Sequence, residues 1–310
     1  MSSRDLAVSL LRSGPVTMLS RLVTRGRLRI LAYHGVPDPD LFAAQMEYLA
    51  RKFTPVGEAA VADAIHRGAK LPSGAAWVTF DDGDPSVVVN GLPTLERLGI
   101  PATMFVCPGL IESGMPFWWR VTEWASEHMP DRAAAVAPTA EELTEHCKLL
   151  SDGRRRLIVD QMLEHMQQPR PEDWRQLSSA ELDAWTDAGM ALGNHTWDHP
   201  CLDQCNETVQ RDQVRDAHEW LTDHLGHPPI SFAYPNGNFS PIVDTEVARL
   251  GYDLGVLYDN KLTPLDSEPL QLSRVMLEAD QPAKRLVGVL SGAQPVARAI
   301  RESIRSDAPV

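Results

Sequence analysis

The feature that most constrains the fold of this sequence is a regular alternation of two kinds of segment. Short apolar, β-rich runs alternate with longer stretches in which apolar residues recur at helical spacing. The expected strands are residues 29–36, 75–80, 100–107, 190–194, 230–234, 252–257 and 270–277. The expected helices are a segment after Ser178 and residues 42–53, 86–98, 207–225, 240–250 and 282–304. Strands separated by helices predict an α/β fold in which a parallel sheet forms one barrel.

The alternation stops between about residues 109 and 177. This stretch is helical in pieces and contains four of the eight tryptophans of the chain. We interpret it as a helical insertion in the barrel. The expected divisions of the chain are a basic N-terminal helical segment over residues 1–28 and the barrel, with its insertion, over residues 29–310.

The charge of the chain excludes one class of partner and singles out one end of the sequence. Its 29 Lys and Arg face 42 Asp and Glu, which gives a formal net charge of −13. Affinity for phosphate backbones comes mostly from Lys and Arg, so we expect no nucleic-acid partner. The first thirty residues differ from this average, because six Arg are interleaved there with apolar residues and one acid, Asp5. They fit either a helix packed on its own domain or a basic amphipathic segment on an anionic membrane surface.

The same N-terminal residues bear on where the protein works. No apolar run approaches the ~20 residues that span a bilayer. Arg12 and Pro15 interrupt the apolar run that a cleaved export signal needs. We therefore expect a cytoplasmic protein, with peripheral contact at the inner face of the membrane if the basic segment binds there. The sequence predicts no oligomeric state.

The four cysteines are too few for a disulfide scaffold in a chain of 310 residues. They are Cys107, Cys147, Cys201 and Cys205. The spacing of Cys201 and Cys205 also allows a closed structural zinc site. We favour four free thiols, most of them buried.

Two adjacent carboxylates, Asp81 and Asp82, follow directly on the expected strand at residues 75–80. Two like charges at such close range raise the pKa of one of them unless a cation is present. A bound metal resolves the conflict, since one Asp binds it while the other is free to act as a base. Alone, an Asp pair in a turn is explained equally well by a solvated loop.

Two histidines, His195 and His199, follow the expected strand at residues 190–194 with the spacing i and i+4. If the segment turns helically, both rings face one cation, and imidazole suits zinc and similar divalent metals. Ordinary polar histidines are the alternative. Beside Asp82 at a neighbouring strand end, they offer one carboxylate and two imidazoles, with positions left for water and substrate, as metal-assisted hydrolysis requires.

A third polar cluster, residues 233–237 (AYPNG), follows the expected strand at residues 230–234. Pro235 and Gly237 favour a tight turn, which can hold a backbone N–H rigidly toward a developing oxyanion. On its own, the sequence is merely a turn. Tyr234, with Phe117, Trp118 and Trp119 of the insertion, fits a sugar-stacking wall, since flat apolar rings suit pyranose faces, but a place in the core is the more common role of such rings.

Taken together and in this order, the three clusters resemble the polysaccharide deacetylase family, the NodB-homology group of carbohydrate esterase 4-like proteins. Residues 79–83 (TFDDG) match its first motif letter for letter, and residues 195–199 (HTWDH) match its second. Its third motif, R-x-P-[FY]-G, aligns on residues 233–237 with two departures. Residues 33–36 (YHGV) and the insertion that opens with residues 117–119 (FWW) look like the exopolysaccharide branch. The resemblance implies a distorted (β/α)7-type barrel.

The resemblance also implies a role for each motif residue. Asp81 would be the catalytic base, and Asp82, His195 and His199 would bind a divalent metal. Zn²⁺ is the first choice, with Co²⁺, Ni²⁺ or Mn²⁺ as alternatives. The Asn236 N–H would stabilise the oxyanion, and the substrate would be an N-acetylated sugar or glycan.

Two departures from the family pattern concern the base and the proton donor. Many members have a late histidine where this sequence has Arg274, and the Arg of the third motif is Ala233 here. One interpretation links the two changes: Arg274 pairs with Asp81 and keeps it ionised. His34 would then donate the proton or contact substrate. The alternatives are a surface ion pair for Arg274 and a partner that orients a metal ligand for His34.

The leading hypothesis is a metal-dependent hydrolase that removes an N-acyl group, foremost N-acetyl, from an amino sugar in a glycan, glycolipid or nucleotide-linked precursor. A non-catalytic carbohydrate-binding or regulatory protein on the same barrel is the main alternative, motivated by the missing late His and Arg. An O-acetyl esterase or a deformylase is a further one.

Overall fold

The computed structural model of the protein describes residue 24 and residues 26–166 and 168–292. The basic segment predicted over residues 1–28 lies almost wholly outside these residues, although its last two positions begin the first strand. Of the helix predicted over residues 282–304, the described part is α14 (Lys284–Leu290). Within the described residues, no helix has both the length and the apolar character needed to cross a membrane.

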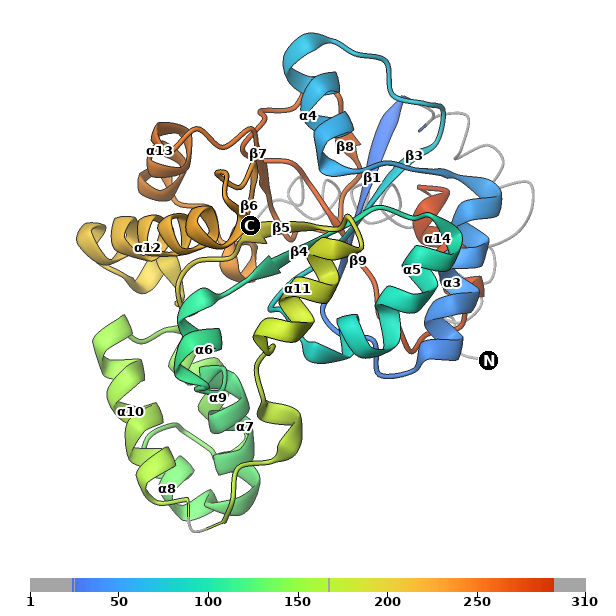
Figure 1. Cartoon of the computed structure of the whole chain (residues 1–310). Helices are drawn as coiled ribbons and strands as arrows, with labels where there is room; N and C mark the ends of the chain where they lie inside the picture. Colours follow the sequence, from blue (N-terminus) through green and yellow to red (C-terminus); the bar gives the residue numbers. More distant parts are fainter. Residues whose placement is uncertain (1–23, 25, 167, 293–310) are drawn as a thin grey trace, which may run out of the picture.

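The centre of the fold is a nine-stranded sheet (Figure 1). Its main path runs β7-β6-β5-β4-β3-β1-β8, and β2 and β9 pair with β3 and β1 beside it. The pairs along the path are parallel except β1 with β8. The strands are β1 (Arg27–Tyr33), β2 (Thr54–Pro55), β3 (Ala75–Phe80), β4 (Ala102–Val106), β5 (Ala191–Asn194), β6 (Ser231–Ala233), β7 (Leu254–Val256), β8 (Thr263–Pro264) and β9 (Val275–Met276).

The segment expected as the last strand, residues 270–277, joins the two ends of the parallel sheet. Its regular strand, β9, has only two residues, so the prediction of one continuous strand was wrong. Leu272 nevertheless forms a parallel bridge with Val256 of β7, and Val275 pairs with Leu31 of β1. The segment therefore connects β7 to β1 and completes the predicted distorted barrel. The antiparallel strand β8 was not predicted.

Helices pack around the outside of this sheet (Figure 1). They are α3 (Pro39–Lys52), α4 (Glu58–Arg67), α5 (Leu92–Leu98), α11 (Ser179–Asp187), α12 (Glu207–Leu225), α13 (Pro241–Arg249) and α14, with single turns η1 (Val87–Gly91), η2 (Glu172–Trp174), η3 (Leu202–Gln204) and η4 (Pro235–Gly237). Local sequence sets their ends: Ser178 accepts a hydrogen bond from the Glu181 N–H and forms a capping box at the start of α11.

The alternation of side chains along the strands decides what points into the barrel. All residues of β3 and β4 are buried, as expected for parallel strands covered on both faces. Along β3, Ala75 and Trp77 join the inner cluster with Phe105, whereas Val78 and Phe80 pack outward under the helices. Because strand side chains alternate, the residues of β3 on the same face as Trp77 point into the barrel.

The insertion forms a separate group of helices beyond the ends of the strands, at the lower left of Figure 1. It consists of α6 (Pro108–Ser113), α7 (Trp118–His128), α8 (Pro130–Ala134), α9 (Leu143–Lys148) and α10 (Asp152–Glu164). It has its own apolar cluster, which includes Trp118, Trp174, Cys147 and Cys201. All four cysteines are buried and free, as predicted.

Candidate active site

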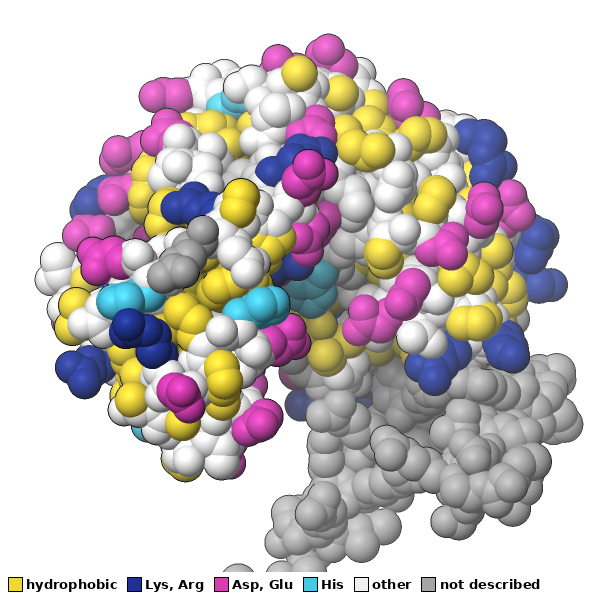
Figure 2. Space-filling view, turned by 90° about the horizontal axis from the view of Figure 1, so that it is seen from below, with side chains coloured by type: hydrophobic (Ala, Val, Ile, Leu, Met, Phe, Trp, Pro, Cys, Tyr) yellow, Lys and Arg dark blue, Asp and Glu magenta, His cyan; other side chains and the backbone are white. Residues whose placement is uncertain are grey.

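The polar residues singled out in the sequence meet at one end of the barrel. Asp81 and Asp82 follow β3, His195 follows β5, and His34 follows β1. Because the strands are parallel, their carboxyl ends lie together, and these side chains line one cavity of about 230 Å³. Figure 2 views this face, and histidine side chains are visible in the hollow where the two lobes of the molecule meet.

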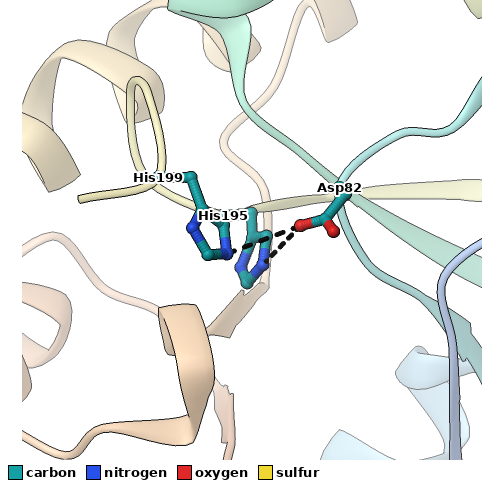
Figure 3. A group of neighbouring side chains, drawn as sticks. All are labelled: Asp82, His195 and His199. Carbon is teal, nitrogen blue, oxygen red and sulfur yellow. Dashed lines mark ion pairs between the residues drawn. The ribbon is translucent and has the colours of Figure 1, made fainter. Parts of the chain in front are cut away.

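A carboxylate and two imidazoles converge at the base of the cavity. His195 Nε2 and His199 Nε2 lie 3.4 and 3.5 Å from Asp82 Oδ1. Both rings are turned toward the carboxylate (Figure 3). Both distances exceed the ~2.9 Å of a good N–H···O hydrogen bond. Potential ligand atoms of the three residues all lie within 4.8 Å of one another, which suits a group that shares one cation.

The hydrogen bonds of the three residues fit a metal site. His195 Nδ1 lies 2.8 Å from the Ala233 carbonyl oxygen, so this nitrogen carries the proton and Nε2 has a free lone pair. Asp82 Oδ1 is buried and has no hydrogen-bond partner among the described residues. A buried carboxylate oxygen without a partner is costly, and a divalent cation between it and the two imidazoles would remove that cost.

The electrostatics of Asp82 and His199 point the same way. Burial raises the pKa of the Asp82 carboxyl, but the neighbouring imidazoles of His195 and His199 outweigh burial and hold that pKa well below its usual range. Burial lowers the pKa of His199 to about 4. At neutral pH, Asp82 is therefore ionised and His199 is neutral, which are the forms that bind a metal.

The backbone around this group is strained. Asp82, Thr196, His199 and Asn236 have φ values of 70°, 69°, 57° and 57°, in the left-handed region that favours glycine. In the described part of the chain, Asn260 is the one other non-glycine residue in that region. Such strain costs free energy and persists where the surrounding structure fixes it, which is typical of functional sites.

Asp81 lies beside the metal-ligand group and is held by one arginine. Arg274 Nη1 and Nη2 each donate to one oxygen of the Asp81 carboxylate, both at 2.6 Å. Arg274 Nη1 also lies 3.1 Å from Thr79 Oγ1, and both charged residues are buried. Burial raises the pKa of Asp81, but the charge of Arg274 outweighs it and lowers that pKa. The predicted pairing is present, and a surface ion pair is excluded for Arg274.

The predicted oxyanion turn is the single turn η4. Pro235 is its first residue, and the Gly237 N–H donates to the Tyr234 carbonyl at 2.8 Å. The Asn236 N–H makes no hydrogen bond with any described residue, so it is available to a ligand. The Asn236 side chain turns toward Cys201 Sγ, at 3.9 Å.

The structure does not bring the rings considered as a stacking wall together on one exposed surface, and Phe117 is itself buried. Tyr234 is buried, its hydroxyl lies 3.1 Å from Asp244 Oδ1, and its ring packs edge-on against Phe232. The Tyr234 ring therefore has the more common of the two roles, a place in the core, although the residue also lines the cavity. Trp118 is buried in the insertion, with one edge at the cavity. Trp119 is partly exposed and lines the cavity.

His34 is exposed at the mouth of the cavity, and its ring meets Tyr258 edge-to-face at 5.4 Å between centroids. Tyr258 itself was missed in the sequence, although its position just after a predicted strand was a usable signal. The residues of the insertion on the far wall of the cavity were also missed. They are Glu123, Thr144, Glu145 and Lys148, and no sequence motif marks them.

A parallel barrel with an Asp-His-His group and a second, ionised Asp at its mouth has the side chains that metal-assisted hydrolysis requires. The sequence model of the polysaccharide deacetylase family matches residues 68–255, more than half of the chain. The protein belongs to this family, which confirms the predicted resemblance and makes it a carbohydrate deacetylase. The matched span contains Asp81, Asp82, His195, His199 and Asn236 but neither His34 nor Arg274.

Solved structures show the same fold. The chain aligns with the deacetylase PplD of Streptococcus pyogenes at a TM-score of 0.62 and 20% identity, over 85% of this chain and 98% of that one. With IcaB of Ammonifex degensii, the TM-score is 0.60 and the identity 20%, over 87% of this chain and 97% of that one. With a de-N-acetylase of Aggregatibacter actinomycetemcomitans, the TM-score is 0.60 and the identity 12%, over 85% of this chain and 99% of that one. No protein of curated function matches the sequence.

Proposed function

We propose that the protein removes the N-acetyl group from an amino sugar in a glycan, glycolipid or nucleotide-linked precursor, and that it uses one divalent cation, foremost Zn²⁺. Asp82, His195 and His199 would hold the cation. The observation that carries the proposal is the position of the ionised Asp81 in the same cavity as these three ligands. The basic first thirty residues favour a lipid-linked substrate at the membrane surface.

A cation at this site would polarise the acetamide carbonyl and acidify the attacking water. Asp81 is the group placed to accept the proton of that water. Its bidentate pairing with Arg274 keeps the carboxylate ionised and fixes its orientation, at the cost of basicity. Each carboxylate oxygen still has a lone pair to offer, because one hydrogen bond from Arg274 occupies only one of the two.

Two further groups of the chain would complete the reaction. The Asn236 N–H, held in a rigid turn, would donate to the oxyanion as it develops. The amine leaves only after it is protonated, and His34 is the titratable side chain at the cavity mouth that could supply the proton. The edge contact with Tyr258 limits the orientations of the His34 ring.

Acetate release tests this proposal. Purified protein is incubated with N-acetylated, N-formylated and O-acetylated sugars, before and after treatment with a chelator, with D81N as the matched inactive control. We expect acetate from N-acetyl substrates, loss of activity after chelation, and recovery with Zn²⁺. Faster release from O-acetyl or N-formyl substrates would assign an esterase or a deformylase instead. Binding of sugars and metal without hydrolysis of any substrate would support the non-catalytic alternative.

The role of His34 has its own test. H34A should lower kcat about 10²-fold on an N-acetyl substrate, the usual worth of a positioned general acid, while zinc binding is unchanged. A leaving group that needs little protonation, such as a nitrophenol in an activated ester, should restore most of the rate. An unchanged kcat on the amide would leave His34 without the donor role.

A further inference from the structure

The two metal-ligand histidines are oriented in different ways. The His195 ring is fixed by its Nδ1, which lies 2.8 Å from the Ala233 carbonyl oxygen. Metal-binding histidines normally have such a partner for the second ring nitrogen. The Nδ1 of His199 is also buried, yet it has no hydrogen-bond partner among the described residues. The position of the His199 ring must therefore be set by its backbone and by the rings around it.

The insertion contacts both the backbone and the ring of His199. The indole N–H of Trp118, at the start of α7, donates to the His199 carbonyl oxygen at 3.2 Å. The ring centroids of Trp119 and Phe117 lie 4.6 and 5.8 Å from that of the imidazole. On the barrel side, the His199 N–H donates to Thr196 Oγ1 at 3.2 Å. The insertion thus touches this ligand through its carbonyl group and on its ring.

The residue before His199 is held by a second part of the insertion. Arg156 of α10 donates to both oxygens of Asp198, at 2.6 and 2.9 Å. The side-chain amide of Gln213, on α12, donates to the Asp198 carboxylate at 2.9 Å and accepts from the Asp198 N–H at 3.1 Å. Asp198 is therefore fixed between the insertion and the barrel, one residue away from a metal ligand with a left-handed backbone.

These two contacts are joined inside the insertion. The Nε of Arg156 donates to Asp152 at 2.7 Å, and Arg155 donates to the other oxygen of Asp152. The Arg155 guanidinium lies over the Trp118 ring, 5.2 Å from its centroid. A continuous chain of charged and aromatic contacts therefore runs from Asp198 through α10 to Trp118 and back to the His199 carbonyl. Such a network holds its ends better than an isolated surface ion pair does.

We infer that Arg156 and Asp198 are positioning residues for the metal site: through them the insertion sets the place of His199, and with it the affinity for the cation. This inference rests on the metal site of the proposed function. It gives the insertion a role beyond that of a cavity wall. An ion pair that only fastens the insertion to the barrel would change folding stability but leave metal affinity unchanged.

Zinc affinity of the stripped full-length protein separates these roles. It is measured by competition with a chromogenic chelator for wild type, R156M, D198N and R156M/D198N, beside the thermal unfolding of each metal-free protein. R154M is the matched control, because Arg154 lies on the same helix, is exposed, and has no hydrogen bond or ion pair within the described residues. We expect about tenfold weaker zinc binding for R156M and for D198N, the scale known for partners that orient metal ligands.

The double variant should bind zinc no more weakly than the single variants, because each single variant already removes the same Arg156–Asp198 interaction. R156K, which keeps the charge but not the paired hydrogen bonds, should recover part of the affinity. Wild-type affinity in R156M and D198N, with or without a change in thermal stability, would overturn the inference, and so would an equal loss in R154M. If the wild type itself binds no zinc, the proposed metal site fails, which is a separate result.

Discussion

The barrel and the insertion build opposite sides of one cavity, and they hold their side chains in different ways. On the barrel side, Asp81 and His195 each follow a strand and have a partner inside the barrel: Asp81 has Arg274, and His195 has the Ala233 carbonyl. On the insertion side, Trp119 and Lys148 lie on short helices and are partly exposed. This difference places the reacting groups on the rigid part and the cavity wall on a part with its own small core.

His199 lies between the two regions and shows how they depend on each other. It comes from the barrel loop after β5, but Phe117 and Trp119 of the insertion pack against its ring, and the Trp118 N–H donates to its carbonyl oxygen. His199 therefore links the barrel, which provides the reacting groups, to the insertion, which provides the cavity wall. Variants on each side should have different signatures, and the predictions below follow from that difference.

The largest effect is expected for D81N, on the barrel side. Asn keeps the shape of Asp81 and removes the base, so kcat should fall about 10³-fold. Zinc affinity should stay within a few-fold of wild type, because Asp81 is not among the three ligands. Steady-state kinetics and chelator competition measure the two quantities. More than a tenth of wild-type kcat in D81N would remove Asp81 from the role of base.

The next largest effect is expected for R274M, which breaks the buried pair. Loss of Arg274 leaves the buried Asp81 carboxylate without its counter-charge, and such a change costs about 3–5 kcal/mol of the free energy of unfolding. Urea unfolding measures it. R97M, which removes an ion pair of 3.3 Å between half-exposed residues, should cost less than about 1 kcal/mol. Equal losses in the two variants would contradict the buried pairing.

Glu58, a buried carboxyl away from the cavity, allows the stability of the barrel to be tested separately from the site. Burial raises its pKa to about 7, although hydrogen bonds from Ser231 and Thr103 lower it. The folded protein then keeps a proton on Glu58 that the unfolded chain releases at lower pH, so this contribution is lost as pH rises through 7. From pH 5 to pH 8, wild type should lose up to about 3 kcal/mol of unfolding free energy relative to E58Q.

Urea unfolding of wild type and E58Q at both pH values measures this loss. Relative kcat of the two proteins should not change with pH, since Glu58 is absent from the residues that line the cavity. A wild-type stability that rises relative to E58Q toward pH 8 would show that the Glu58 carboxyl is not buried as described.

The smallest effect is expected on the insertion side, for W119A. The ring lines the cavity, so its loss should raise KM about tenfold at saturating zinc and change kcat little, as for the loss of one stacking contact. W124A is the matched control, because Trp124 lies on the same helix and packs inside the insertion against Trp174. A KM effect of the same size in both variants would mean that Trp119 acts only through the fold of the insertion.

The barrel side of the site could be predicted from the sequence because the position of each residue relative to its own strand fixes its place. A polar residue that directly follows a buried parallel strand must lie at the mouth of the barrel, which placed Asp81, Asp82 and His195. The pairing of Arg274 with Asp81, 193 residues away, was predicted from two departures from the family pattern: Ala233 replaces the Arg of the third motif, and Arg274 replaces the late histidine.

The insertion side could not be predicted in the same way. Glu123 and Lys148 reach the cavity only through the packing of short helices, which has no fixed sequence period. Tyr234 was considered as a substrate contact because flat apolar rings suit sugar faces, but its ring is buried beside Phe232. Asp198 lies inside a recognised motif, and its partner on α10 became apparent only in three dimensions.

The most direct test of the account is the position of the cation. Crystals grown with one equivalent of Zn²⁺ and measured at the zinc absorption edge give its site from anomalous scattering. We predict one strong peak bound by Asp82 Oδ1, His195 Nε2 and His199 Nε2, at the usual zinc distances of about 2.0–2.2 Å. A peak elsewhere, for example at the thiols of Cys201 and Cys205, or no peak in protein that releases acetate, would contradict it.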